Sequence, residues 1–225
     1  MSPTRLFVTG TGTGIGKTVF TVALTQAARS RGLRVRAVKP VETGCLGGRA
    51  EDALALAAAA GRPEDAELPG FHRGERPLAP FAATLEGEPP PPPIPALARA
   101  IDAASDDADL VLVEGAGGLL VPYDETHTFA DLAVALATPL VLLLPNELGA
   151  LHHAEAAIEA AKARGLQIAA LVLVARPAAD LAAESNARVL ERRHPAVRLA
   201  AFPWSEDAAH RASAASRLLD IILDT

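Results

Sequence analysis

Short runs of bulky apolar residues alternate with longer alanine-rich stretches along this chain of 225 residues. The last three apolar runs are nearly unbroken Leu, Val and Ile, which is typical of strands buried on both faces of a sheet. We predict strands at 6–9, 35–38, 110–113, 140–144 and 168–174. We predict helices at 16–31, 51–60, 94–104, 129–137, 150–164, 181–193 and 207–223. This alternation predicts an α/β fold of three layers, with a mostly parallel central sheet and helices on both faces.

Residues 61–93 interrupt the alternation because they are rich in proline. The prolines are Pro63, Pro69, Pro77, Pro80 and the run at 89–93. Proline fixes φ and has no N–H, so we expect a semi-rigid loop or a polyproline connection here rather than a strand. A plain spacer is favoured over a motif for a proline-binding partner. We therefore expect a single domain over 1–225 that contains this loop.

The charge and cysteine content exclude several classes of protein. There are 21 basic and 27 acidic residues, a net charge of -6, which argues against a general nucleic-acid binder. One cysteine, Cys45, forms neither an internal disulfide nor a cysteine-built metal site, so we read it as a loop thiol. No apolar stretch approaches the ~20 residues of a membrane helix, and no signal peptide is recognisable, so we expect a cytoplasmic protein.

A glycine-rich loop follows the first predicted strand and opens the first predicted helix. It reads Gly10-Thr-Gly-Thr-Gly-Ile-Gly16-Lys17-Thr18. Glycines let backbone amides face a phosphate, the helix start adds partial positive charge, Lys17 can reach terminal phosphates and Thr18 can bind Mg²⁺. Five residues rather than four separate Gly10 from Gly16, so this is a variant P-loop. It predicts a P-loop NTPase-like fold, and it fits a dinucleotide loop poorly because the second strand ends in Lys39.

Two further clusters follow predicted strands. Lys39 comes directly after 35–38, and Glu114 comes directly after 110–113 and is followed by three glycines and an alanine. Carboxyl ends of parallel strands meet at one edge of a sheet, where ligands bind. An acidic residue there suits the metal-organising carboxylate of a P-loop enzyme. A solvated lysine at a strand end remains the alternative for Lys39.

Together these motifs resemble the dethiobiotin synthetase family, and the resemblance spans most of the chain. The motifs are Val8-Thr9-Gly10-Thr11 through Lys17-Thr18, Lys39-Pro40-Val41 with Thr43-Gly44, Asp52-Ala53-Leu54-Ala55-Leu56, Glu114-Gly115-Ala116-Gly117-Gly118, Phe129-Ala130-Asp131, Leu148-Gly149 with His153-Ala154, and Pro203-Trp204. No single motif decides the matter, but their order and spacing together are highly specific.

The resemblance implies an ATP-dependent ring-closing ligase. In that family CO₂ carboxylates a nitrogen of 7,8-diaminononanoate, ATP phosphorylates the carbamate, and the second amine displaces phosphate to close a cyclic urea. By this resemblance Lys39, Lys17 and Thr13 are the catalytic residues. Lys39 would hold the carbamate and the transferring phosphoryl group, while Thr13 and Thr43 would orient the substrate. Such anionic intermediates require positive charge and amide donors more than a protein nucleophile.

The resemblance also implies the nucleotide and metal ligands. The nucleotide positions are Gly14, Ile15, Gly16, Lys17, Thr18, Val19, Asp52, Glu114, Gly115, Ala116, Gly117, Ala175, Arg176, Pro203, Trp204 and Ser205. Thr18, Asp52 and Glu114 are the candidate Mg²⁺ ligands, as hard oxygens suit that ion. Without the resemblance, Asp52 would be read as a first-turn carboxylate that complements the helix dipole.

The resemblance also implies a homodimer, through the helix start after the fourth predicted strand. Gly149, Ala150 and Leu151 open this helix, and in the family the corresponding element comes from the neighbouring subunit and holds the substrate carboxylate. The adjacent pair His152 and His153 does not share one helix face, so we do not expect it to bind a metal.

This chain departs from the family where the adenine base is read. The strand at 168–174 is followed by Ala175 and Arg176, where the family has an asparagine that pairs with adenine. Alanine cannot form those hydrogen bonds, so we expect a triphosphate to be required but the preference for ATP over another NTP to be reduced.

Two other functions are disfavoured. A nucleotide-switched partition or positioning ATPase usually has a second lysine in its P-loop and often a basic C-terminal helix, whereas this loop has no second lysine and the stretch from Leu218 onward is acidic. The synthetase half of a cobyrinate-type amidotransferase would need a glutaminase domain, for which the chain is too short.

Overall fold

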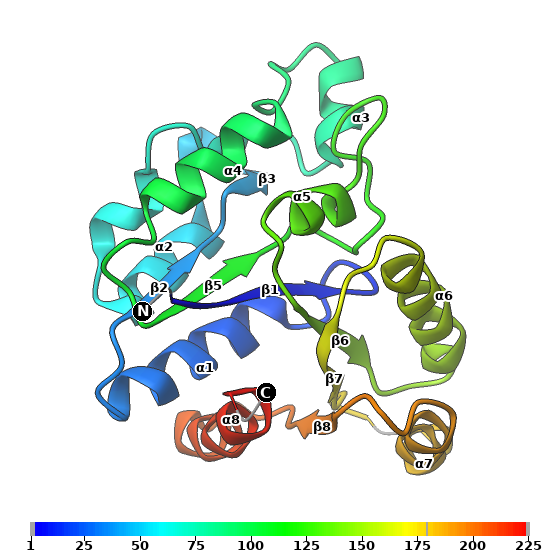
Figure 1. Ribbon diagram of the computed structural model, residues 1–225. Coiled ribbons are helices and arrows are strands. Elements are labelled where there is room, and N and C mark those ends of the chain that lie inside the picture. The colour runs from blue at the N-terminus through cyan, green and yellow to red at the C-terminus, as the bar shows by residue number, and fades with distance from the viewer. Residues whose placement is uncertain (1–2, 179, 224–225) are drawn as a thin grey trace.

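The computed structural model describes residues 3–178 and 180–223, and its centre is a parallel sheet of six strands (Figure 1). The strands are β1 (Thr4–Gly10), β2 (Val35–Val38), β5 (Leu110–Glu114), β6 (Leu140–Pro145), β7 (Ile168–Val174) and β8 (Leu199–Phe202). They lie in the order β2-β5-β1-β6-β7-β8, and each neighbouring pair is parallel. The predicted fold class and all five predicted strands are confirmed. The rest of the 1–225 range, including the end of the acidic tail at 224–225, lies outside the described residues.

Helices cover both faces of this sheet (Figure 1). One face packs against α1 (Lys17–Ser30) and α8 (Ala208–Leu223), with α2 (Glu51–Ala60) beside α1 at the β2 edge. The other face packs against α4 (Ile94–Ala103), α5 (Phe129–Ala135), α6 (Ala150–Ala163) and α7 (Ala183–Arg193). The seven predicted helices are confirmed, with ends that shift by a residue or two.

The alternating direction of the side chains along β1 explains how this one strand contributes to the cores on both faces of the sheet. Leu6 and Val8 are buried in the cluster that contains α1, whereas Phe7 is buried with Phe129 of α5. Successive side chains of a strand point to opposite faces, so a continuous apolar run fills two cores. The sheet therefore holds the ends of β1, β2 and β5 rigidly side by side.

The proline-rich segment is more regular than expected. Residues 61–93 contain a 3₁₀ helix at Pro63–Glu67, strand β4 (His72–Gly74) and helix α3 (Pro80–Leu85). The expectation of no strand was wrong, because β4 pairs in parallel with β3 (Val41–Thr43) in a second, two-stranded sheet. β4 falls between Pro69 and Pro77, so its own N–H groups are free to pair. β8 was also missed, because its run is short and interrupted by small alanines.

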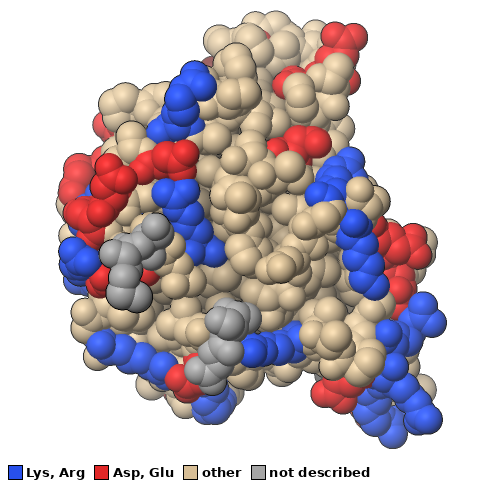
Figure 2. All heavy atoms as spheres, in the orientation of Figure 1, with Lys and Arg blue, Asp and Glu red and all other residues tan. Residues whose placement is uncertain are grey.

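Charged side chains are interleaved rather than segregated on the surface. Figure 2 shows one face of the molecule, where Lys and Arg side chains alternate with Asp and Glu around a largely uncharged centre. This arrangement agrees with the argument against a broad polyanion-binding surface. Within the described part of the chain, every helix is too short or too polar to cross a membrane.

The thiol of Cys45 is expected to react slowly with disulfide reagents in the folded protein. Its side chain lies in a small apolar cluster with Ala50, Ala53 and Ala57. Burial, together with the nearby Glu42 carboxylate, raises the pKa of the thiol. Since the thiolate is the reactive form, a disulfide reagent at pH 7.5 should react far more slowly with native protein than with protein unfolded in urea. Equal rates would contradict this burial.

Candidate functional site

The predicted motifs meet at the carboxyl edge of the sheet around a cavity of about 600 Å³. The predicted residues that line it are Thr13, Gly14, Gly16, Lys17, Thr18, Val19, Lys39, Thr43, Asp52, Ala116, Gly117 and Trp204. Glu114 lies beneath this lining and is completely buried. Residues from five separate segments of the chain thus converge because β1, β2 and β5 end side by side.

A charged cluster forms the floor of the cavity. Lys39 Nζ donates to Glu114 Oε1 at 2.6 Å and to Asp52 Oδ2 at 2.9 Å. Thr18 Oγ1 also donates to Glu114 Oε1, at 2.8 Å. The other carboxylate oxygen, Oε2, accepts from Thr21 Oγ1 at 2.7 Å. Glu114 therefore joins β5, the start of α1 and the end of β2 in one hydrogen-bonded network.

Lys39 is held in its charged form despite its burial. Only 4% of the residue is exposed, and this burial acts to lower its pKa. Glu114 and Asp52 outweigh the burial, so the pKa of Lys39 is raised overall. In turn, burial acts to raise the pKa of Asp52, but Lys39 outweighs it and the pKa is lowered. The site thus keeps a fixed ammonium group and an ionised carboxylate at neutral pH.

Lys17 supplies a second cation to the same cavity. Its Nζ donates to the Gly12 carbonyl at 2.8 Å. Burial and the nearby charge of Lys39 lower the pKa of Lys17 to about 8, so at pH 7 both lysines are mainly protonated. Two cations in one cavity repel each other, and an anionic ligand would relieve that repulsion.

The start of α1 offers free amide donors to the same ligand. Gly16, the residue before the helix, has φ 95° and gives α1 no side-chain cap. The first N–H groups of a helix have no partner within it, and the residues that carry them here, Lys17, Thr18 and Val19, all line the cavity. A phosphate is the group that such a helix start binds.

The two glycine loops require glycine because they lie against each other. A Cβ on Gly118 would lie 3.2 Å from the Gly10 carbonyl oxygen. Gly117 has φ +66°, and a Cβ there would meet the Val121 side chain at 2.8 Å. A side chain at position 118 would press against the P-loop backbone, whereas one at position 117 would be strained by the positive φ and would meet Val121 of its own loop.

The side-chain oxygen atoms at the cavity floor are suitable ligands for a hard divalent cation. Three side chains with oxygen atoms lie together here. Thr18 hydrogen-bonds to Glu114, and the carboxylates of Glu114 and Asp52 both accept from Lys39 Nζ. Among the described residues, no group of three or more His, Cys, Asp or Glu side chains could hold a metal alone. Two carboxylates and a hydroxyl suit Mg²⁺, which is commonly held by one or two carboxylates together with substrate phosphates.

The predicted base-pocket residues are only partly brought to the cavity. Trp204 lines it, whereas Ala175, Arg176, Pro203, Ser205 and also Ile15 and Gly115 do not. Ala175 N donates to the Phe202 carbonyl, and Arg176 Nε pairs with Glu147 Oε2 at 3.1 Å. The guanidinium of Arg176 is thus already engaged outside the cavity.

The start of α6 also lies away from the main cavity. Gly149 has φ 94° and no side-chain cap, and neither it nor Ala150 and Leu151 lines the 600 Å³ space. A smaller hollow of about 350 Å³ lies between the glycine loops and α6, where it is lined by His153.

Asp131, part of one recognised motif, has a structural role. Its side chain and that of Thr128 form a capping box at the start of α5. The carboxylate accepts from the Thr128 backbone N–H at 2.7 Å and from its hydroxyl at 2.8 Å. This motif therefore orders the helix that follows the second glycine loop.

Several residues of the site were missed in the sequence. Val121 and the segment 77–80 line the cavity, and Thr21, Glu42 and Arg73 hold its polar groups in place. Thr21 carries a detectable signal, because a residue three positions after Thr18 faces the same side of a helix. Glu42 and Arg73 act through tertiary contacts that no local pattern reveals. Arg73 is on β4, inside the segment expected to be irregular, and its Nη1 donates to the Lys39 carbonyl at 2.9 Å.

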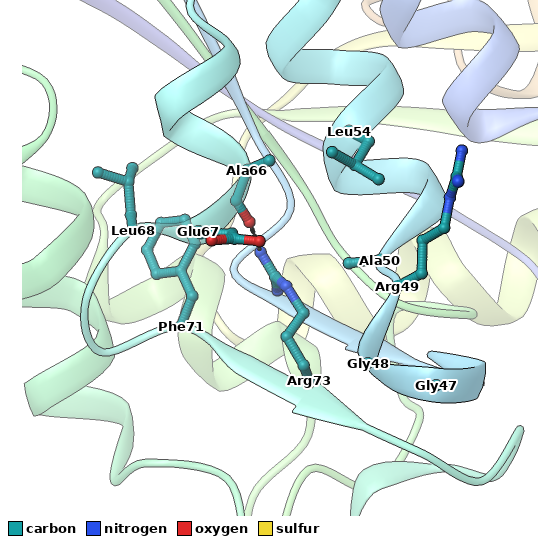
Figure 3. A pocket seen from close by; sticks show the side chains of 10 residues that line it. All are labelled: Gly47, Gly48, Arg49, Ala50, Leu54, Ala66, Glu67, Leu68, Phe71 and Arg73. Atoms are coloured by element: carbon teal, nitrogen blue, oxygen red, sulfur yellow. Dashed lines mark hydrogen bonds between the residues drawn. The ribbon is translucent and has the colours of Figure 1, made fainter.

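A second cavity, of about 470 Å³, lies on the other side of Arg73 (Figure 3). It shares no lining residue with the first cavity. Figure 3 shows Arg73 reaching from β4 toward Ala66, whose carbonyl accepts from Nη2 at 2.7 Å. Arg73 thereby ties the 3₁₀ helix at Pro63–Glu67 to the backbone of Lys39.

The chain is similar in sequence to a family of known proteins. A family model described as AAA domain matches residues 4–212. The chain is 41% identical over 219 residues to an ATP-dependent dethiobiotin synthetase from Anaeromyxobacter dehalogenans, which covers 95% of this chain and 96% of the relative. Another, from Saccharopolyspora erythraea, is 41% identical over 182 residues, or 80% and 79% of the two chains.

A solved structure shows the same fold. Chloroplast FtsY from Physcomitrella patens aligns with a TM-score of 0.56 and 17% identity, over 96% of this chain and 66% of that one. At this identity the likeness concerns the arrangement of strands and helices alone.

Proposed function

Because the chain belongs to the ATP-dependent dethiobiotin synthetases, within the AAA-domain family, we propose that its cavity closes a cyclic urea on 7,8-diaminononanoate. The protein is an ATP-dependent ligase of biotin biosynthesis, as its relatives' names state. The observation that carries the proposal is the convergence of Lys17, Lys39 and the α1 amides on one cavity. Every intermediate of the reaction is anionic at this point, which is what these groups stabilise.

The reaction divides into three balanced steps. One amine of the substrate adds to CO₂ and loses a proton, which gives a carbamate. A carbamate oxygen then attacks the γ-phosphorus of the triphosphate, so that a carbamic–phosphoric anhydride forms and the nucleoside diphosphate leaves. Finally the second amine attacks the carbonyl carbon and loses a proton, and phosphate departs with the bridging oxygen. The chain supplies position and charge and forms no covalent bond to the substrate.

Each residue of the cavity has a role in this scheme. Lys39 binds the carbamate and then the transferring phosphoryl group, while Lys17 neutralises charge between the β- and γ-phosphates. The α1 amides cradle the phosphates, and Thr13 and Thr43, which both line the cavity, orient the diamine. Thr18, Asp52 and Glu114 would hold Mg²⁺. When bound, that ion would draw electron density from the γ-phosphate oxygens.

A direct test follows phosphate release. Protein, Mg²⁺, bicarbonate and ATP are mixed with and without 7,8-diaminononanoate. We expect release to depend on the diamine, because without it no carbamate forms to accept the phosphoryl group. Release at the same rate without diamine would overturn the proposed function.

The complete site is proposed to need a second copy of the chain. Gly149–Leu151 lie outside the main cavity of their own subunit, and a helix start uncapped by a side chain suits the substrate carboxylate. In a homodimer the partner's α6 would supply it. A mixture of Lys39→Gln and Gly149→Val subunits tests this.

Neither variant should be active alone, but a mixed dimer has one intact site. Random pairing of equal amounts makes half of the dimers mixed, so about a quarter of wild-type activity should return. Absence of complementation in verified mixed dimers would contradict a shared site.

The preference for adenine is expected to be weak. Ala175 has no side-chain donor or acceptor, and Arg176 is engaged by Glu147. A site that reads a base by paired hydrogen bonds can discriminate by roughly 10⁴-fold, whereas here kcat/KM for ATP, GTP and CTP should agree within about 100-fold. Steady-state kinetics with each triphosphate measures this, and a preference for ATP near 10⁴-fold would refute it.

A further inference from the structure

Glu42 reaches from β3 to the start of α2. Its carboxylate accepts the backbone N–H of Asp52 on Oε1 at 2.9 Å and that of Ala53 on Oε2 at 2.8 Å. These are the second and third residues of the helix. Only 7% of Glu42 is exposed. Its side chain thus caps a helix that begins nine residues later in the chain.

The sequence of α2 makes this distant cap necessary. Ala50 occupies the N-cap position and provides no side-chain hydrogen bond. The first amides of a helix otherwise remain unpaired, and an unpaired donor near a buried surface is destabilising. A carboxylate at this end also complements the helix dipole. Glu42 supplies both effects from the strand that follows Lys39.

The cap acts on the one residue of α2 that contacts the catalytic lysine. Asp52 donates its backbone N–H to Glu42 while its own carboxylate accepts from Lys39 Nζ. Glu42 itself forms no ion pair with a described lysine or arginine. Because both of its oxygens are occupied by amides, it is poorly arranged to accept a proton from the substrate.

We propose that Glu42 is a positioning residue for ring closure: by holding the first turn of α2, it sets Asp52 against Lys39 and so fixes the lysine charge in the cavity. This inference rests on the proposed role of Lys39. A small displacement of a catalytic charge can cost about 10²-fold in rate. Glu42 lines the cavity, but both of its carboxylate oxygens are engaged by the α2 amides, so the effect should fall on kcat rather than on the KM for the diamine or the triphosphate.

Kinetics of three variants test the positioning role. Glu42→Ala should lower kcat roughly ten- to hundredfold with little change in either KM. Glu42→Gln keeps one acceptor oxygen for one of the two amides, so it should recover part of the loss. Glu51→Ala is the matched control, because Glu51 lies in the same helical turn but its side chain is 70% exposed and pairs with the exposed Arg49. It should behave like the wild type.

The double variant Glu42→Ala, Asp52→Asn separates positioning from general stability. If Glu42 acts through Asp52, its removal should change kcat by less than about threefold once Asp52 is already altered. Circular dichroism identifies unfolded variants, and Glu42→Gln serves if Glu42→Ala does not fold. The same loss of kcat in both backgrounds, or full activity of Glu42→Ala, would overturn the inference. Loss of diamine-dependent release in the wild type would instead overturn the proposed function.

Discussion

Lys39→Gln is expected to lower kcat by about a thousandfold or more while the protein stays folded. Removal of a single preorganised donor from a developing charge costs about 10²–10³ in rate, and Lys39 contributes a full charge as well as donors. The fold should survive because Glu114 keeps the hydroxyl donors of Thr18 and Thr21. Phosphate release under saturating substrates measures kcat, and circular dichroism reports the fold.

Lys162→Gln provides the control for that variant. Lys162 lies exposed on α6, far in sequence from the cavity residues, and its loss removes the same charge from the whole molecule. It should leave kcat unchanged. Near-normal turnover by Lys39→Gln would mean that Lys39 is only a structural partner of Glu114.

Glu114→Gln should impair both turnover and stability. Glu114 is fully buried and accepts hydrogen bonds from Thr18, Thr21 and Lys39. The –NH₂ group of glutamine would replace one carboxylate oxygen. It is itself a donor, so it would face the neighbouring donors and could not accept from them. A buried donor left unpaired costs about 1–3 kcal/mol, which urea unfolding detects. The variant also frees Lys39 from its carboxylate partner and removes a candidate Mg²⁺ ligand. We therefore expect kcat to fall at least about 10²-fold.

Glu125→Gln is the matched control, because Glu125 is an exposed carboxylate in a loop beyond the site. It should leave both quantities unchanged. If Glu114→Gln kept wild-type kcat and unfolded at the same urea concentration, the hydrogen-bonded network at the cavity floor would have no functional role.

Much of the sheet edge could be foreseen from local patterns. Local patterns located β2 and β7 with the bounds that the structure has. Once parallel strands were assigned, Lys17, Lys39 and Glu114 had to gather at one edge, because each directly follows a strand or its loop. Topology thus predicts which residues meet, even where their partners are unknown.

Contacts between distant segments could not be foreseen in the same way. β3 and β4 are short strands that stabilise each other only after the chain has folded, so their sequences carry little signal. Glu42 looks like a polar strand residue until α2 is placed beside it. Only the family resemblance indicated that Asp52 belongs to the site. A carboxylate in the first turn of a helix is otherwise explained by its interaction with the helix dipole. The structure adds that Asp52 pairs with Lys39.

The fate of oxygen from CO₂ tests the central claim most directly. With freshly prepared ¹⁸O-labelled CO₂, ATP, Mg²⁺ and 7,8-diaminononanoate, a carbamate oxygen becomes the bridging oxygen of the anhydride and leaves with phosphate. Mass spectrometry of the released phosphate should therefore find one ¹⁸O atom for each ring closed. Unlabelled phosphate, formed with oxygen from water, would contradict phosphoryl transfer to a carbamate held by Lys39.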